Sequence, residues 1–417
     1  MRNDAKPRGL AAYAAVTAAY WAFMLTDGAL RMLVLLHFHE LGFSPIQLAW
    51  LFLLYEVMGM VTNLSAGWLA ARFGLTSTLY AGLALQIAAL VALAQLDPGW
   101  GLIGSVIYVM AVQGVSGVAK DLAKMSSKSA VKLLAPSGDG ALFRWVAVLT
   151  GSKNAVKGLG FLLGTVLLGA LGFTASVWAM AAALAVILAA VALFMPAGLP
   201  RGKKGAKFTE VFSKNRDINR LSAARLFLFG ARDVWFVVGI PIYFYAVLSD
   251  GSEAGNRAAF FQIGSFMALW IIGYGAVQAW APRLLRASDK PLSDIARLAT
   301  RWVAGLTLIP LALAALALAG PQPWLTAAVI AGLMLFGFVF AVNSSLHSYL
   351  ILALSQAERV TMDVGFYYMS NAAGRLTGTL LSGLSYQIGG LPLCLFTAAL
   401  MAGLSYICIR RLTPGAG

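Results

Sequence analysis

The chain has 417 residues, of which 60% are hydrophobic and 11% are charged. Soluble domains carry roughly 25% charged residues, so this composition excludes a soluble globular protein and indicates many membrane-spanning segments. The net charge of +15 comes from short loops between apolar runs, which is typical of membrane proteins. It therefore does not indicate a nucleic-acid partner, and the lipid bilayer is the partner that the composition predicts.

Apolar runs long enough to cross a bilayer, about 20 residues each, can be placed along the whole chain. The first six cover residues 10–38, 45–71, 77–95, 100–125, 141–171 and 174–195, and the second six cover 221–248, 258–281, 296–318, 324–354, 364–388 and 391–409. We therefore predict an all-α integral membrane protein with 12 transmembrane helices in two six-helix bundles, residues 1–195 and 221–417. Residues 196–220 form a basic cytoplasmic linker, which could be a topology signal or could bind anionic lipid.

Lysine and arginine are distributed unequally between the loops on the two sides of the predicted membrane. If the N-terminus lies in the cytoplasm, Arg257 is the one loop cation assigned to the outer side. An excess of these residues marks cytoplasmic loops, so we predict that both termini lie in the cytoplasm. The first span contains charges and is long, unlike the short apolar core of a cleavable signal sequence.

Several predicted spans contain charged side chains, although each costs roughly 2.5–3.5 kcal/mol at the centre of a membrane helix. Arg31 and Arg232 occupy matching places in the first and seventh spans, each close to an aspartate. The third, sixth and twelfth spans have no central charge, and the ninth has Arg297 and Arg301 only at its cytoplasmic start, so we predict that every third span faces lipid. Among the charges within the spans are Asp27, Arg31, Glu56, Lys120, Asp121, Lys124, Lys153, Lys157, Arg225, Arg232, Asp233 and Arg375.

Cations outnumber carboxylates within the spans, which predicts an anionic substrate. A guanidinium group can donate two parallel hydrogen bonds to phosphate or arsenate, whereas lysine acts as a point charge. We expect Arg31 and Arg232 to clamp an oxyanion between the two halves of the chain. Alternatively, Asp27 and Arg31, spaced i and i+4, neutralise each other. The predicted basic cavity is completed by Lys120, Lys153, Lys157 and Arg375, whereas the role of Lys124 stays open.

Further residues are weaker candidates for proton coupling or substrate binding. Glu56 is the preferred coupling carboxylate, because a buried carboxylic acid can exchange a proton near neutral pH. His347 could carry a proton or be held by hydrogen bonds, and Asp27, Asp121 and Asp233 are candidate coupling or ion-pair residues. The polar groups that could contact the substrate are those of Tyr20, Asn154, Tyr243, Asn343, Tyr367 and Asn371.

Metal and covalent chemistry have little support in the sequence. His37 and His39 lie two residues apart, on opposed faces of a helix, with Glu40 beside them, which does not favour a metal site. Both cysteines, Cys394 and Cys408, lie in the last span. We therefore predict no metal, no cofactor, no catalytic residue and no enzymatic activity.

Two helices share small-residue spacing, Gly160 to Gly164 and Gly374 to Gly378, which permits close helix approach and could serve packing or gating. Over its whole length the chain resembles the major facilitator superfamily (MFS). That family's loop motif is visible in residues 67–74, GWLAARFG, although the usual acidic residue is replaced by alanine. The resemblance implies a central cavity lined by helices 1, 4, 7 and 10, and transport by alternating access.

Residues 20–33, 117–128 and 229–235 further resemble the ArsJ-type organoarsenical efflux permeases of bacterial arsenic-resistance systems. This resemblance implies export of 1-arseno-3-phosphoglycerate across the bacterial inner membrane. The implied functional partner is glyceraldehyde-3-phosphate dehydrogenase, which makes this ester when arsenate replaces phosphate. A pentavalent arsenate ester is a hard oxyanion and suits arginine and lysine, whereas trivalent arsenic would require thiolates.

Other functions stay open from the sequence. An organophosphate/phosphate exchanger or another organic-anion porter would share the arginine pair, whereas a drug/proton antiporter would need an acidic cavity. A membrane transferase would need a nucleophile or a His/Asp pair, for which we find no candidate. Coupling could use protons, phosphate or the membrane potential alone, because expelling an anion from a negative-inside cell gains about 2.3 kcal/mol per charge per 100 mV.

Overall fold

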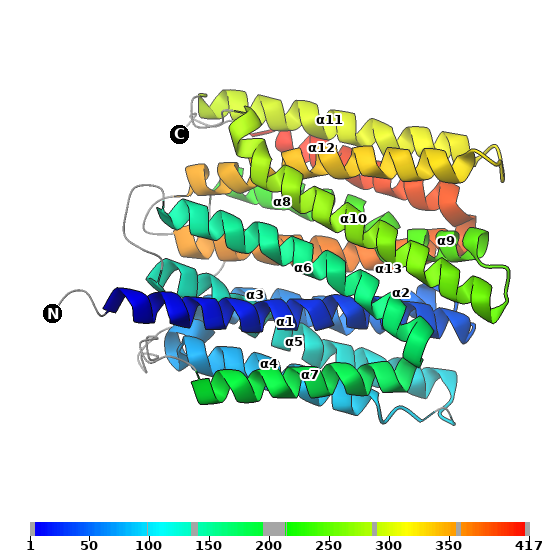
Figure 1. Ribbon diagram of the computed structural model, residues 1–417. Helices are drawn as coiled ribbons and strands as arrows, with labels where there is room; N and C mark the ends of the chain where they lie inside the picture. The colour runs from blue at the N-terminus through cyan, green and yellow to red at the C-terminus, as the bar shows by residue number, and fades with distance from the viewer. Residues whose placement is uncertain are drawn as a thin grey trace. The chain divides into compact units, whose positions relative to one another are not determined.

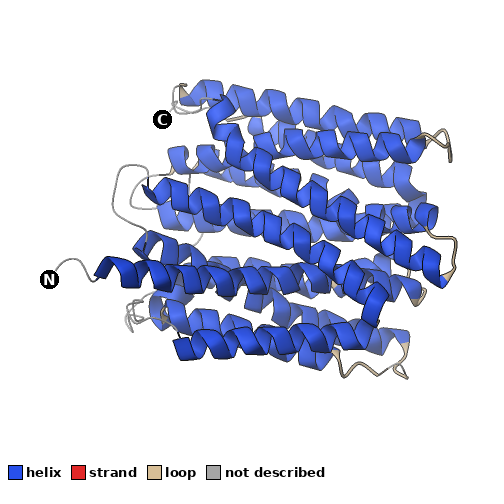
Figure 2. Cartoon of the chain, viewed as in Figure 1, coloured by secondary structure: helices blue, strands red, loops and turns tan. Residues whose placement is uncertain are grey.

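The computed structural model describes residues 5–97, 99–134, 141–194, 213, 215–285, 290–355 and 360–412, and all structural statements concern these residues. Within them the chain is helical apart from short connections, and Figure 2 shows no strand in the described part. The predicted linker lies outside the described residues up to Lys214, apart from Ser213. Most side chains of the predicted loop motif also lie outside them.

Fourteen helical elements follow one another along the described chain (Figure 1). They are α1 (Ala5–Glu40), α2 (Pro45–Leu51), α3 (Leu53–Phe73), α4 (Leu75–Leu93), α5 (Leu102–Leu134), α6 (Ala141–Leu171), α7 (Phe173–Phe194), α8 (Arg216–Val234), the π-helical turn η1 (Trp235–Gly239), α9 (Ile240–Leu248), α10 (Glu253–Leu285), α11 (Leu292–Ala317), α12 (Leu325–Leu354) and α13 (Val360–Ile409).

The described residues contain 11 stretches that are long and apolar enough to cross a membrane. The last of them, Asp363–Ile409, is interrupted at Gly389 and Gly390, where the backbone leaves the helical conformation. Gly390 has a φ of 59°, which glycine adopts without steric cost. This break falls between the predicted eleventh and twelfth spans, so the predicted all-α, multi-span fold is confirmed.

Two compact units form within the chain, and each combines segments that are distant in the sequence. Unit 1 contains Met1–His37, Val61–Thr209 and Phe260–Ile272, and unit 2 contains Phe38–Met60, Glu210–Ala259 and Gly273–Gly417. In unit 1, α4 packs against α5 and α7, and in unit 2, α13 packs against α8 and α11 (Figure 1). The division into bundles 1–195 and 221–417 stays a prediction.

In unit 1, glycines allow α6 to lie directly against α1. A side chain at Gly160 would overlap the carbonyl oxygen of Leu25, and one at Gly164 would overlap that of Ala29. Small residues at such positions let helix backbones approach closely in membranes. The close approach predicted from this glycine spacing is therefore present.

The same crossing recurs in unit 2 between α8 and α13. A side chain at Gly374 would overlap the carbonyl oxygen of Leu226, and a Cβ at Gly378 would lie 2.8 Å from that of Gly230. Leu226 and Gly230 of α8 lie 201 positions after Leu25 and Ala29 of α1. The two glycines of α13 lie 214 positions after those of α6. Arg232 also follows Arg31 by 201 positions, so the two arginines hold equivalent places beside their crossings.

The predicted seventh span is not a regular helix, because η1 separates α8 from α9. Pro241 follows the turn and has no backbone N–H with which to continue the helical hydrogen bonds. Two N–H groups at the end of η1 donate to the hydroxyl of Ser382 at 3.2 and 3.1 Å, and the thiol of Cys394 donates to the carbonyl of Val234 at 3.1 Å. Side chains of α13 thus satisfy backbone groups that the bilayer cannot satisfy.

We expect the substitution Gly374→Ala to destabilise the protein, because the added methyl group would push α13 away from the backbone of α8. Overpacking of this kind typically costs about 1–3 kcal/mol. The matched control is Gly305→Ala in α11, where an added Cβ meets nothing within 4 Å. Thermal unfolding of both purified variants in detergent tests the expectation, and equal midpoints would contradict it.

Candidate functional site

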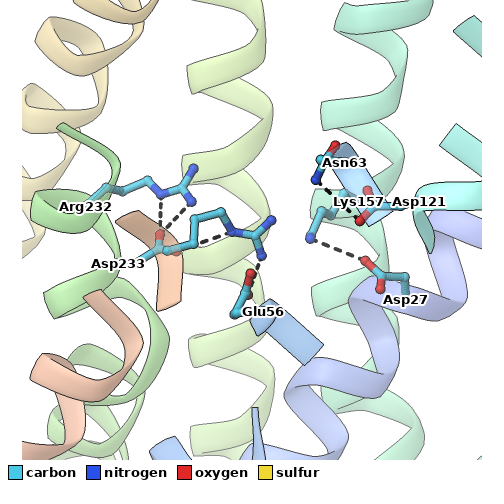
Figure 3. A network of polar contacts seen from close by, with 8 residues as sticks. Asp27, Glu56, Asn63, Asp121, Lys157, Arg232 and Asp233 are labelled. Carbon is cyan, nitrogen blue, oxygen red and sulfur yellow. Dashed lines mark hydrogen bonds and ion pairs between the residues drawn. The ribbon is translucent and has the colours of Figure 1, made fainter. Parts of the chain in front are cut away.

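In unit 2, charged side chains of α3, α8 and α13 form a row in which positive and negative charges alternate. Arg232 donates from Nε to the Oδ1 atom of Asp233 at 2.6 Å, and Arg375 donates to the Oε1 atom of Glu56 at 2.6 Å. The Nε atom of Arg375 also lies 3.5 Å from the Oδ2 atom of Asp233. Figure 3 shows Glu56, Arg232 and Asp233 of this row of charges.

The two carboxylates of this row of charges are less exposed than its two guanidinium groups. The side chains of Glu56 and Asp233 are 1% and 2% exposed, against 17% for Arg375 and 12% for Arg232. The predicted ion-pair role of Asp233 is present, and Glu56 has a basic partner on a distant segment. Two cations facing two carboxylates are formally neutral, so an anion that binds these arginines must compete with the carboxylates.

Aromatic rings fix the position of Arg232. Its Cζ atom lies 4.8 Å from the ring centroid of Phe229, 5.6 Å from that of Phe340 and 5.9 Å from that of Phe236. Each such cation–π contact contributes roughly 0.5–2 kcal/mol, depending on its exposure. The guanidinium is therefore held in one orientation before any ligand arrives, as a binding group should be.

Arg225 is a further buried arginine of unit 2, and its hydrogen-bond partners are neutral. It donates to the hydroxyl of Ser344 at 3.0 Å and to the carbonyl oxygen of Ser344 at 3.3 Å. Its Cζ atom lies 4.0 Å from the ring centroid of Phe229 and 5.0 Å from that of Tyr367. Reasoning from the sequence did not place Arg225 in the site, although its seven-residue spacing from Arg232 was a usable signal.

In unit 1, Asp27 of α1 pairs with Lys157 of α6 at 3.3 Å (Figure 3). The sequence shows no acid within a turn of Lys157 on its own helix, but the neighbouring helix supplies one. Asp27 therefore has a basic partner on a neighbouring helix, and its mutual neutralisation with Arg31 stays a prediction. The pair also reduces the surplus of cations on which the predicted basic cavity depends.

A second polar cluster of unit 1 links α5 to α3. The hydroxyl of Thr62 donates to the Oδ2 atom of Asp121 at 2.8 Å. The amide of Asn63 approaches the same oxygen at 3.4 Å (Figure 3). Lys124 donates to Asp121 at 3.1 Å and to Asn63 at 2.7 Å. Lys124 thus forms an ion pair with Asp121, and its role in the site stays open. Lys120, one residue before Asp121, is buried.

Two predicted substrate contacts take part in hydrogen bonds between helices. The hydroxyl of Tyr243 pairs with that of Thr326 at 3.0 Å, and the amide of Asn343 donates to the carbonyl oxygen of Ala299 at 3.0 Å. A structural role accounts for both bonds. Of the other predicted polar residues, Tyr20, Asn154, Tyr367 and His347 are buried, whereas Lys153, Asn371 and Arg31 are partly exposed.

The two histidines near the end of α1 each contact an aromatic ring. His37 stacks on Phe173 with ring centroids 4.1 Å apart, and His39 meets Tyr245 edge-on at 5.0 Å. In the part of the chain that the structure describes, no group of three His, Cys, Asp or Glu side chains could hold a metal ion.

Known proteins resemble this chain in structure rather than in sequence. No protein-family model matches the sequence, and no curated protein matches it. Two crystal structures of POT family transporters, in complex with a thioalcohol-conjugated peptide and with 5-aminolevulinic acid, match with TM-scores of 0.74 and 0.73. In both cases the identity is 14%, and the match covers 95% of this chain and 94% of the other. The chain therefore has the fold of these membrane transporters, which agrees with the predicted MFS-type architecture.

We expect a double-mutant cycle to detect the pair of Glu56 and Arg375. Removing one member of a buried ion pair strands the other charge and typically costs about 3–5 kcal/mol. The variant Glu56→Ala should therefore unfold at a lower temperature, and the further change Arg375→Ala should restore part of the loss.

The exposed pair of Asp294 and Arg297 provides the control, because its side chains are 42% and 73% exposed. Surface pairs contribute about 0–1 kcal/mol, so the same cycle there should show little coupling. Strictly additive losses at Glu56 and Arg375 would argue against a buried pair.

Proposed function

We propose that the protein is a membrane transporter for small, multiply charged organic oxyanions. The observation that carries this proposal is Arg232, a guanidinium held among three aromatic rings inside a spanning helix. A charge in that place is costly unless it serves a ligand path. The shared fold supports transport, since the matched POT structures are described as transporters.

The substrate we propose is 1-arseno-3-phosphoglycerate, exported across a bacterial inner membrane to detoxify arsenate. The arginines support an oxyanion, and the resemblance of residues 20–33, 117–128 and 229–235 to ArsJ-type permeases supports this particular ester. Glyceraldehyde-3-phosphate dehydrogenase would supply the substrate. The second candidate is an organophosphate/phosphate exchanger, which the same arginines favour.

Proton coupling at Glu56 would follow from its contact with Arg375. The guanidinium donates to Glu56 at 2.6 Å, so a substrate oxyanion and the carboxylate compete for the same donor. A proton that binds Glu56 breaks the ion pair and leaves Arg375 available to the anion. Proton uptake and anion binding therefore favour each other, and this coupling is reciprocal. Because a proton and the anion bound together would move in the same direction, an inward proton gradient opposes export, and the membrane potential or phosphate exchange would have to drive it.

We expect Arg31→Ala and Arg232→Ala to abolish arsenate resistance in cells that depend on this protein. Each change removes a guanidinium that would donate two charge-assisted hydrogen bonds to the oxyanion. Arg232→Lys should retain part of the activity, because lysine keeps the charge without the planar fork. Growth on arsenate is measured at equal amounts of membrane-inserted protein.

Arg257→Ala is the control for this experiment, because Arg257 lies at an exposed helix start and pairs with the exposed Glu253. It should grow like the wild type. Full resistance in the Arg31 and Arg232 variants, at normal insertion, would refute the role of these arginines.

We expect Glu56→Gln to bind phosphoglycerate more tightly than the wild type, because the carboxylate that competes for Arg375 is then absent. Calorimetry on detergent-solubilised protein at one pH measures both affinities. Equal affinities would exclude Glu56 as a competitor for Arg375, and flux in vesicles under voltage alone would then support the uncoupled alternative.

A further inference from the structure

Arg225 and Arg232 lie on one face of α8. Seven residues make nearly two helical turns, with a drift of only about 20° and a rise of about 10 Å. Phe229 stands between them, with its ring centroid 4.0 Å from the Cζ atom of Arg225 and 4.8 Å from that of Arg232. The two guanidinium carbons are therefore separated by at most the sum of these distances, about 9 Å.

The charges of these two arginines are compensated differently. Arg232 has Asp233 as its partner, whereas none of the described carboxylates pairs with Arg225, which is 3% exposed. Asp363 lies one turn before Tyr367 on α13 and forms no ion pair with Arg225. The hydroxyl and carbonyl dipoles of Ser344 solvate the charge but do not cancel it, and a buried charge without a counter-charge is costly.

Further polar atoms near Arg225 are buried and have no hydrogen-bond partner. They are the Nε atom of Arg225 itself and both ring nitrogens of His347, a side chain with no exposed surface. His347 lies one helical turn after Ser344, the hydrogen-bond partner of Arg225, on the same helix α12. A neutral imidazole offers one N–H donor. Unused donors beside an uncompensated cation are what an oxyanion requires.

We propose that Arg225 and His347 form a second oxyanion position, so that α8 holds one ligand at two ends. The ligand class is a small organic molecule with an oxyanion group at each end, one group at Arg232 and the other at Arg225, with its carbon chain beside Phe229. The spacing of the guanidinium groups is comparable with the length of a three-carbon chain esterified at both ends. This inference rests on the proposed function, because it assigns the second end of that substrate.

Two stable probes separate one-ended from two-ended binding, namely propane-1,3-diol bisphosphate and propyl phosphate. Affinities are measured by calorimetry on the full-length protein in detergent. Arg225→Gln should weaken binding of the bisphosphate by about 10- to 100-fold, the effect of losing a charged hydrogen bond, and should change binding of propyl phosphate less than about twofold. Arg232→Gln should weaken binding of both probes. The exposed Arg297→Gln serves as the control and should bind both like the wild type.

The outcomes distinguish this inference from the proposed function. If the wild type binds both probes and Arg225→Gln affects both equally or neither, the second oxyanion position is refuted while the transporter proposal stands. If the wild type binds neither probe, both proposals are refuted. If Arg225→Gln fails to fold, Arg225→Lys is measured instead. A loss of affinity for the bisphosphate alone again supports the second position, whereas affinities equal to those of the wild type overturn it.

Discussion

The absence of water in the bilayer core is the constraint on which this structure depends, because each charge and each backbone polar group there needs a partner inside the protein. Charged side chains of the spans meet this demand by reaching across helices, as Lys157 does with Asp27 and Arg375 does with Glu56. Each such contact joins two helices at one depth. Ion pairs of this kind therefore determine which helices must remain adjacent and which ligands could compete for the cations.

Close helix crossings and ion pairs occur together in both units. In unit 1, α1 meets α6 at Gly160 and Gly164, and Lys157 stands one turn before the first of these glycines. In unit 2, Arg375 follows Gly374 at the crossing of α13 with α8. Backbones in direct contact allow little displacement, because protein interiors are close-packed. The crossings can therefore position the charged groups with the precision that binding an oxyanion requires.

Much of the fold could be predicted from the sequence, because span length and hydrophobicity are local properties. Partners across helices could not, because Glu56 and Arg375 are 319 residues apart and no local pattern links them. For the same reason, the sequence predicted no acidic partner for Lys157, whereas the fold places Asp27 beside it. The partner of Arg225, Ser344, stands 119 residues away, so the sequence offered only the seven-residue spacing of Arg225 from Arg232 as a signal.

The π-helical turn after Asp233 limits how far the two halves of the chain can be equivalent. A π turn holds one residue more than an α turn, so side chains beyond it point about 100° away from the direction that a continuous α-helix of 3.6 residues per turn would give. The 201-residue correspondence holds through Arg232, but Tyr243 would correspond to Gly42, which lies beyond the end of α1. Beyond this turn, positions 201 residues apart no longer face the same way, so the seventh span presents a set of side chains that the first span does not match.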